Sequence, residues 1–282
     1  MLNPVIGMDP EYQINESNDS YINVEDGRRI MNRKYMGLKG LLLGLAYFFA
    51  SQANAVPVGL ELALLVDVSG SVNNSEYNLQ KTGYVNAFKD PALASILPTN
   101  GIAVTYIEWS GSSQQAQLVD WTHITDATSA SNFGDDIAAT SRAFGGSTAP
   151  GSAINFAVPK FNNNGFEGVR LVIDVSGDGR QNSGANTANA RDAALAAGID
   201  AINGLPILTD DPSLDTWYQN NVVGGTGAFL LTANNFSDFA QAIQQKIKRE
   251  VGGGGGGTVP EPATMFLFAI GLVGFGIQRK KS

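Results

Sequence analysis

Residues 60–71 have the sequence LELALLVDVSGS, an almost continuously apolar run that ends in an aspartate and two serines. Such a run is typical of a central strand in a parallel sheet, because helices cover that strand on both faces. Asp67, Ser69 and Ser71 lie at alternate positions where the chain leaves the predicted strand. Gly70 permits a tight turn there, so we expect the three side chains to face one point.

The rest of residues 58–251 alternates between strand and helix patterns. The predicted strands are 60–66, 102–109, 169–175 and 199–207, with 115–121 pairing beside the second. The first predicted helix has its N-cap at Asn74 or Ser75, and two more cover 153–158 and 185–197. The last predicted helix starts near Phe236, and its C-terminal end carries Lys246, Lys248 and Arg249. This alternation implies a doubly wound α/β fold with a mostly parallel sheet and helices on both faces. Its ligand site is expected at the carboxyl ends of the strands.

The oxygen side chains after the first strand suit a hard cation, Mg²⁺ first, with Mn²⁺ or Ca²⁺ as alternatives. Their Asp-x-Ser-x-Ser pattern resembles the metal-ion-dependent adhesion site (MIDAS) of von Willebrand factor A domains, which have a Rossmann-like fold. In that family a threonine and a second aspartate come from later loops. Thr148, in GGSTAPG at 145–151, and Asp178, in DVSGDG at 174–179, match them.

The resemblance implies a role for each of the five residues. Ser69, Ser71 and Thr148 would bind the metal directly, while Asp67 and Asp178 would act partly through water, which leaves one position open. One departure is Gly177, because a hydroxyl residue often precedes this aspartate in the family. Asp174 is the alternative ligand, although an aspartate inside an apolar strand is more often structural. The alternative for the whole set is that these residues form only polar turns and caps.

Residues 61–246 also resemble a bacterial subfamily of A-type proteins of unknown function. The resemblance rests on three stretches, EWSG at 108–111, IDVSGDG at 173–179 and INGLPI at 202–207.

The first 55 residues are predicted to be an N-terminal extension and a secretory signal peptide. Five basic residues precede the apolar run 40–50, and Ala53-Asn54-Ala55 follows it, so cleavage is expected after Ala55. A membrane anchor or buried helix is the alternative, but eleven residues are too few to span a bilayer. Because residues 1–30 are polar and acidic, unlike an export signal, we expect the true start at Met31 or Met36 instead of Met1.

The other end has three parts after the domain, which is predicted at 56–251. A glycine-rich linker at 252–258 leads to Pro260-Glu261-Pro262, an uncharged segment at 263–277 and three basic residues at 279–281. Residues 259–282 resemble the PEP-CTERM sorting signal of Gram-negative bacteria, which implies an exosortase as a processing partner. A helix over 263–277 would span the roughly 30 Å hydrocarbon core only marginally, so we expect a transient membrane anchor. A permanent tail anchor is the alternative.

Composition excludes several classes of function. The net charge of −8 argues against a nucleic-acid partner, and the absence of cysteine excludes disulfides and thiolate ligands. No phosphate-binding loop or Gly-x-Ser-x-Gly elbow occurs, and the single histidine, His123, is expected in a strand or turn. Trp109, Trp121 and Trp217 are expected to be core residues, although a carbohydrate surface is the alternative. We therefore assign no catalytic residue and no cofactor other than the cation.

The predicted function is metal-dependent binding or adhesion outside the cell. Two aspartates would offset the charge of a divalent ion, so the open position would accept a carboxylate from a protein or surface polymer. The exported product is expected at the cell surface or in the extracellular matrix of a Gram-negative bacterium. A metal-stabilised matrix scaffold is the first alternative, and a metal-dependent hydrolase is the second.

Overall fold

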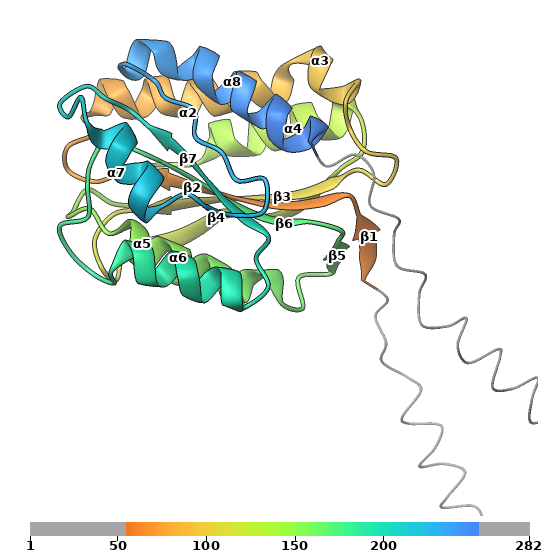
Figure 1. Cartoon of the computed structure of the whole chain (residues 1–282). Coiled ribbons are helices and arrows are strands. Elements are labelled where there is room, and N and C mark those ends of the chain that lie inside the picture. Colours follow the sequence, from red (N-terminus) through yellow and green to blue (C-terminus); the bar gives the residue numbers. More distant parts are fainter. Residues whose placement is uncertain (1–54, 254–282) are drawn as a thin grey trace, which may run out of the picture. The chain divides into compact units, whose positions relative to one another are not determined.

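The computed structural model describes residues 55–253, in which helices cover both faces of a six-stranded sheet (Figure 1). The strand order is β4-β3-β2-β6-β7-β8. The strands are β2 (Leu60–Asp67), β3 (Ile102–Trp109), β4 (Gln115–Ile124), β6 (Leu171–Gly177), β7 (Ala201–Pro206) and β8 (Gly224–Gly225). The four central strands are parallel, whereas β4 and β8 are antiparallel edges. The predicted doubly wound, mostly parallel α/β fold is confirmed.

The helices form two layers, one on each face of the sheet. One layer has α2 (Asn74–Lys89), α4 (Ala127–Ala139) and α8 (Phe236–Gly252), with the short α3 (Pro91–Ala94) after α2. The other has α5 (Pro150–Ala157), the 3₁₀ turn η1 (Val158–Phe161), α6 (Thr187–Ala196) and α7 (Leu214–Asn221). A separate two-stranded sheet pairs β1 (Val56–Val58) with β5 (Phe166–Gly168).

Strand β2 lies between the two halves of the core, and all eight of its residues are buried. Its side chains alternate between faces, so Leu64 packs with the α2, α4 and α8 core while Leu65 packs with the α5, α6 and α7 core. The next strand in sequence lies on one side of β2 and β6 lies on the other. The strand order therefore reverses at β2, and open α/β sheets usually bind their ligands at the carboxyl ends of the strands beside such a reversal.

The structure corrects two local predictions and adds one feature that was not predicted. Helix α2 is capped by Asn73, which forms a capping box with Glu76, instead of by Asn74 or Ser75. Helix α5 begins at Pro150, three residues before the predicted start, because proline suits the first turn of a helix. Lys246 lies in the C-terminal half of α8 and is fully buried against Asp174 and Glu250.

The two predicted export signals lie outside the described residues. Between residues 55 and 253 no helix is both long and apolar enough to cross a membrane. The segment 263–277 and the predicted signal peptide fall outside this range, so both stay predictions.

Candidate metal centre

The loop after β2 brings three of the predicted residues together. Asp67 is the last residue of β2 and is fully buried, and its Oδ1 accepts a hydrogen bond of 2.8 Å from the backbone N–H of Ser69. The hydroxyl oxygens of Ser69 and Ser71 are 3.1 Å apart. Ser69 is buried and Ser71 is exposed, so the loop runs from the core to the surface at this point.

The fourth residue, Asp178, follows β6 directly. Because β2 and β6 are parallel neighbours with Val66 opposite Ser176, the two aspartates leave the sheet side by side. The hydroxyl of Ser71 donates a hydrogen bond of 2.7 Å to Asp178 Oδ1. Four of the five predicted residues are thus in one connected group.

The fifth residue, Thr148, lies in the loop before α5, which contacts the other two loops. The backbone N–H of Gly70 donates to the carbonyl of Gly146 at 2.8 Å. The backbone N–H of Thr148 donates to Asn182 Oδ1 at 2.9 Å, and that of Asn182 donates to the Thr148 carbonyl at 3.0 Å. A Cβ at Gly179 would lie 3.6 Å from Thr148 Oγ1, so this hydroxyl faces the residue that follows Asp178. The loop that carries Thr148 therefore lies beside the two loops that carry the other four predicted residues, at the carboxyl ends of β2 and β6.

Gly177 is explained by the space around the Asp67 carboxylate. A Cβ at position 177 would lie 2.6 Å from Asp67 Oδ2 and 2.8 Å from the hydroxyl of Tyr218 on α7. Real side chains do not approach this closely, so a hydroxyl residue does not fit here. The departure from the usual family pattern follows from how tightly Tyr218 packs against this part of β6.

The electrostatics favour a bound cation. Burial, together with the charge of Asp178, raises the pKa of Asp67 to about 8, and burial also raises the pKa of Asp178. Asp67 Oδ2 is buried and has no hydrogen-bond partner among the described residues. Burying a carboxylate without a partner is costly, and a divalent cation would offset the charge of both carboxylates. The five oxygen side chains therefore fit a hard cation.

Only two of the five residues are carboxylates, which sets this site apart from acidic metal clusters. Within residues 55–253 no group of three or more His, Cys, Asp or Glu side chains is placed to hold a metal ion. The remaining oxygens at the candidate site come from hydroxyls, as in the predicted set.

Two residues that were not predicted, Arg142 and Asn182, support the loops of the candidate site. Arg142 Nη2 donates to the carbonyls of Val68, Ser69 and Val72 at 2.9, 2.9 and 2.7 Å, which holds the first loop in its curve. Asn182 joins the second and third loops, as described above. Neither residue belongs to a recognisable pattern, because each acts through backbone groups that only the fold brings near.

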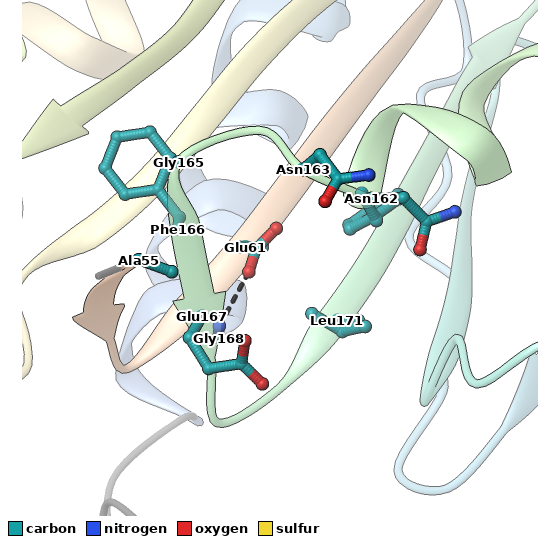
Figure 2. Close-up of a pocket in the computed structure, with 10 residues that line it drawn as sticks. Ala55, Glu61, Asn162, Asn163, Gly165, Phe166, Glu167, Gly168 and Leu171 are labelled. Atoms are coloured by element: carbon teal, nitrogen blue, oxygen red, sulfur yellow. Dashed lines mark hydrogen bonds between the residues drawn. The ribbon is translucent and has the colours of Figure 1, made fainter. Parts of the chain in front are cut away.

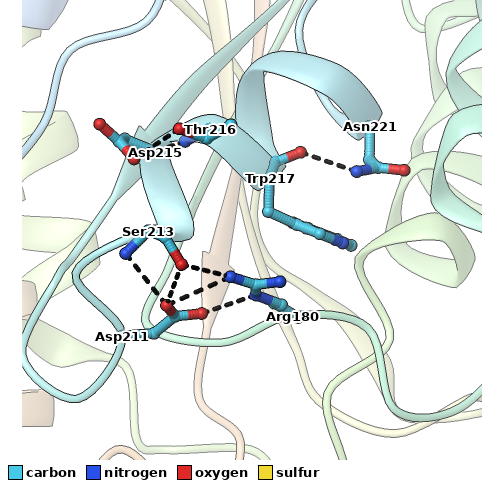
Figure 3. Close-up of polar contacts among 7 residues, drawn as sticks. All are labelled: Arg180, Asp211, Ser213, Asp215, Thr216, Trp217 and Asn221. Atoms are coloured by element: carbon cyan, nitrogen blue, oxygen red, sulfur yellow. Dashed lines mark hydrogen bonds and ion pairs between the residues drawn. The ribbon is translucent and has the colours of Figure 1, made fainter.

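Arg180 and Asp211 form a charged pair that links the loop after β6 to the segment before α7 (Figure 3). Arg180, two residues after Asp178, donates from Nε to Asp211 Oδ2 and from Nη2 to Ser213 Oγ, each at 2.6 Å. The hydrogen bond from Arg180 lowers the pKa of Asp211 to about 2. The Arg180 side chain is 46% exposed, and its charge is paired with that of Asp211.

His123 and the alternative ligand Asp174 lie away from the five candidate residues. His123 on β4 is opposite Ala103 at the start of β3, whereas Asp67 is opposite Trp109 at its end. Six residues of strand separate them, or roughly 20 Å at about 3.3 Å per residue. Asp174 lies inside strand β6 and contacts Lys246 in the core, not the five residues at the carboxyl ends of β2 and β6.

The three tryptophans are buried or half-buried. Trp109 is fully buried and Trp217 is half-buried on α7. Trp121, also half-buried, donates its ring N–H to the Lys160 carbonyl at 2.9 Å. These positions agree with their predicted packing roles.

A pocket of about 420 Å³ lies at the other end of β2, between the two sheets (Figure 2). Its buried carboxylate, Glu61, accepts hydrogen bonds of 2.6 Å from the backbone of Gly168 and the side chain of Asn164. Both oxygens are engaged, so this pocket has no unpartnered carboxylate comparable to Asp67.

Sequence comparisons identify both parts of the chain. The family described as "Protein of unknown function (DUF1194)" matches residues 57–254, and the PEP-CTERM protein-sorting motif matches residues 258–280. A comparison with curated proteins gives no match.

Solved structures share the fold at low sequence identity. Proximal thread matrix protein 1 (PTMP1) from the mussel byssus is 15% identical, with a TM-score of 0.50 over 68% of this chain and 47% of that chain. A von Willebrand factor type A protein from Catenulispora acidiphila is 13% identical, with a TM-score of 0.50 over 70% of this chain and 43% of that chain. A second PTMP1 structure has a zinc-occupied MIDAS motif and is 15% identical, with a TM-score of 0.49 over 67% of this chain and 45% of that chain. The zinc is a property of that protein.

This chain spans less than half the length of these structures, so the likeness concerns one domain and its fold. The predicted A-type subfamily of unknown function and the predicted sorting motif are both confirmed. The chain has a von Willebrand factor A fold, carries a PEP-CTERM sorting motif and belongs to the family described as "Protein of unknown function (DUF1194)".

Proposed function

We propose that the chain is an exported binding module in which Asp67, Ser69, Ser71, Thr148 and Asp178 hold a divalent cation. Mg²⁺ is the first choice, with Mn²⁺ or Ca²⁺ as alternatives, because all the ligands are hard oxygens. The observation that carries the proposal is the buried, unpartnered Oδ2 of Asp67 beside a second carboxylate. A bound cation removes both the missing partner and the repulsion.

The arrangement supports binding of an anionic partner. When bound, the cation supplies an electrophilic position that accepts an anionic oxygen, since two carboxylates and three neutral hydroxyls leave it with no excess negative charge. Ser71 is exposed, so a partner reaches the site from solvent. The chain has a net charge of −8, which repels an acidic partner, so the bound cation would supply the attraction. A carboxylate on a protein or surface polymer is the matching group.

The sorting motif supports the proposed location. The motif implies export to the cell envelope, and we propose that an exosortase removes the C-terminal segment so that the domain reaches the cell surface or matrix. PTMP1, which shares the fold, is a thread matrix protein of the mussel byssus, and this agrees with a role in an extracellular material.

The test is a pull-down of cell-surface and matrix extract with the exported protein, in Mg²⁺ and then in chelator. Ser71→Ala removes a proposed ligand, and Ser75→Ala is its matched control because Ser75 is an exposed serine whose hydroxyl makes no hydrogen bond among the described residues. We expect capture in Mg²⁺ by wild type and Ser75→Ala, and loss of capture in chelator or with Ser71→Ala. Capture that survives chelator would refute the proposal. Metal-dependent melting with no captured partner would favour the scaffold alternative.

A further inference from the structure

Helix α8 carries a lysine that lies entirely inside the core. Lys246 Nζ is 2.6 Å from Asp174 Oδ1 on β6 and 3.1 Å from Glu250 Oε1 one turn later in α8. All three side chains have 0% exposure. The ring centroid of Phe229 lies 5.1 Å from Nζ, so one side of the amine is covered by an aromatic face.

The two carboxyl groups have different surroundings. Glu250 Oε1 accepts hydrogen bonds from Lys246 and, at 2.6 Å, from Asn203 Nδ2. Asn203 is itself fixed, because its Oδ1 accepts from the backbone N–H of Phe229 at 2.7 Å. Neither oxygen of Asp174 accepts a hydrogen bond of normal geometry, although Nζ is in contact with it. Glu250 Oε1 therefore has two donors, whereas Glu250 Oε2 and both oxygens of Asp174 accept no hydrogen bond among the described residues.

The charges favour a neutral Asp174. With one amine and two carboxyl groups, a fully ionised cluster would bury an excess negative charge away from water, which is costly. Burial raises the pKa of Asp174, the ion pair with Lys246 opposes this, and the charge of Glu250 adds to the rise. Uptake of one proton by Asp174 removes this excess. When Glu250 then takes the proton of Lys246, which it contacts at 3.1 Å, a neutral amine is left in contact with a neutral carboxylic acid. These are the nucleophile and the electrophile of amide formation.

We propose that Lys246 and Asp174 join in an intramolecular amide bond, with Glu250 as the proton-transfer group. The Nζ lone pair attacks Cγ of the protonated Asp174 carboxyl, and the C=O π electrons move onto oxygen. Glu250 delivers its proton to the hydroxyl group, the C–O bond breaks as the carbonyl re-forms, and one water leaves. Glu250 then takes a proton from the nitrogen, which leaves the neutral amide. The balance needs no oxidant or other reactant. Groups held in contact can reach effective concentrations of about 10⁵ M or more, which favours condensation inside the core.

The bond would tie the last helix to the centre of the sheet. It would close a loop between positions 174 and 246, and such a link stabilises a fold by restricting the unfolded chain. The chain has no cysteine, so an exported protein of this sequence has no disulfide for that purpose.

Tryptic mapping of the denatured, full-length protein tests the bond. Trypsin does not cut at an amidated lysine, so the proposal predicts a branched peptide that joins residues 171–180 to residues 192–248, lighter than their sum by one water. Recovery of residues 171–180 and 192–246 as separate peptides from folded wild type would overturn the proposal.

Three variants separate the bond from the ion pair. Lys246→Arg keeps the charge but should abolish the branched peptide. Lys248→Arg is the matched control, because Lys248 pairs with Asp90 on the surface, and should retain the branch. Glu250→Gln should lose or greatly slow branch formation after refolding, whereas unchanged branching in this variant would overturn the role of Glu250.

Discussion

Gly177→Ala tests whether the close packing around Asp67 matters for the metal site. The added Cβ would lie 2.6 Å from Asp67 Oδ2 and 2.8 Å from the Tyr218 hydroxyl, and both residues are fully buried. Since neither neighbour has free space, either the carboxylate or α7 must move. Overpacking of this kind costs about 1–3 kcal/mol of stability, and a displaced ligand lowers metal affinity by about 10- to 100-fold.

Gly179→Ala is the matched control for this prediction. Its Cβ would meet the side chain of Thr148 at 3.5 and 3.6 Å, which are ordinary contact distances. We expect its melting temperature and Mg²⁺ affinity to stay near those of wild type, as measured by thermal unfolding and titration calorimetry. If Gly177→Ala matches wild type in both measurements, or if the two variants lose the same amount, the packing argument is wrong.

Four further predictions follow from the same structure. Asp67→Ala should abolish measurable Mg²⁺ binding, because it removes the buried carboxylate, and calorimetry with unchanged affinity would contradict this. Thr148→Ala should reduce metal-dependent capture of a partner while shifting the melting temperature little, and an equal loss of both would count against its proposed role. Burial raises the pKa of Glu61, so the stabilisation from this group is complete below the unfolded pKa of about 4.3 and is lost as pH rises through the higher folded pKa. Glu61→Gln should flatten this part of the curve of unfolding free energy against pH. An unaltered curve would refute the prediction. Intact mass spectrometry of the native protein should find a C-terminus near Pro260 to Pro262, and inner-membrane protein that retains Ser282 in an exosortase-containing host would defeat the sorting proposal.

The sheet and the first loop could be predicted because their signals are local. Strand β2 is a continuous apolar run, and the polar residues that follow it have a spacing that already places them together. The bounds of β3 were also predictable, since Ile102 to Trp109 is fully buried. Helix α4 gave no such signal, because it packs through Ala130, Phe133, Gly134 and Ile137, and two of these are small.

Features that depend on distant contacts could not be predicted. A lysine near the C-terminus of a helix is usually solvated and favoured by the helix dipole, so nothing local marks Lys246 as buried. Its partner Asp174 lies on another element, and the pairing exists only once α8 covers β6. Arg142 and Tyr218 are similar cases, since each supports the candidate site from a part of the chain that only the fold brings near.

Titration calorimetry of Mg²⁺ into the metal-free exported protein tests the central claim most directly. We predict one bound ion per chain, with binding lost in Asp67→Ala and Ser71→Ala and kept in Ser75→Ala. The absence of binding by wild type, or equal affinity in all four proteins, would contradict a metal centre at the carboxyl ends of β2 and β6.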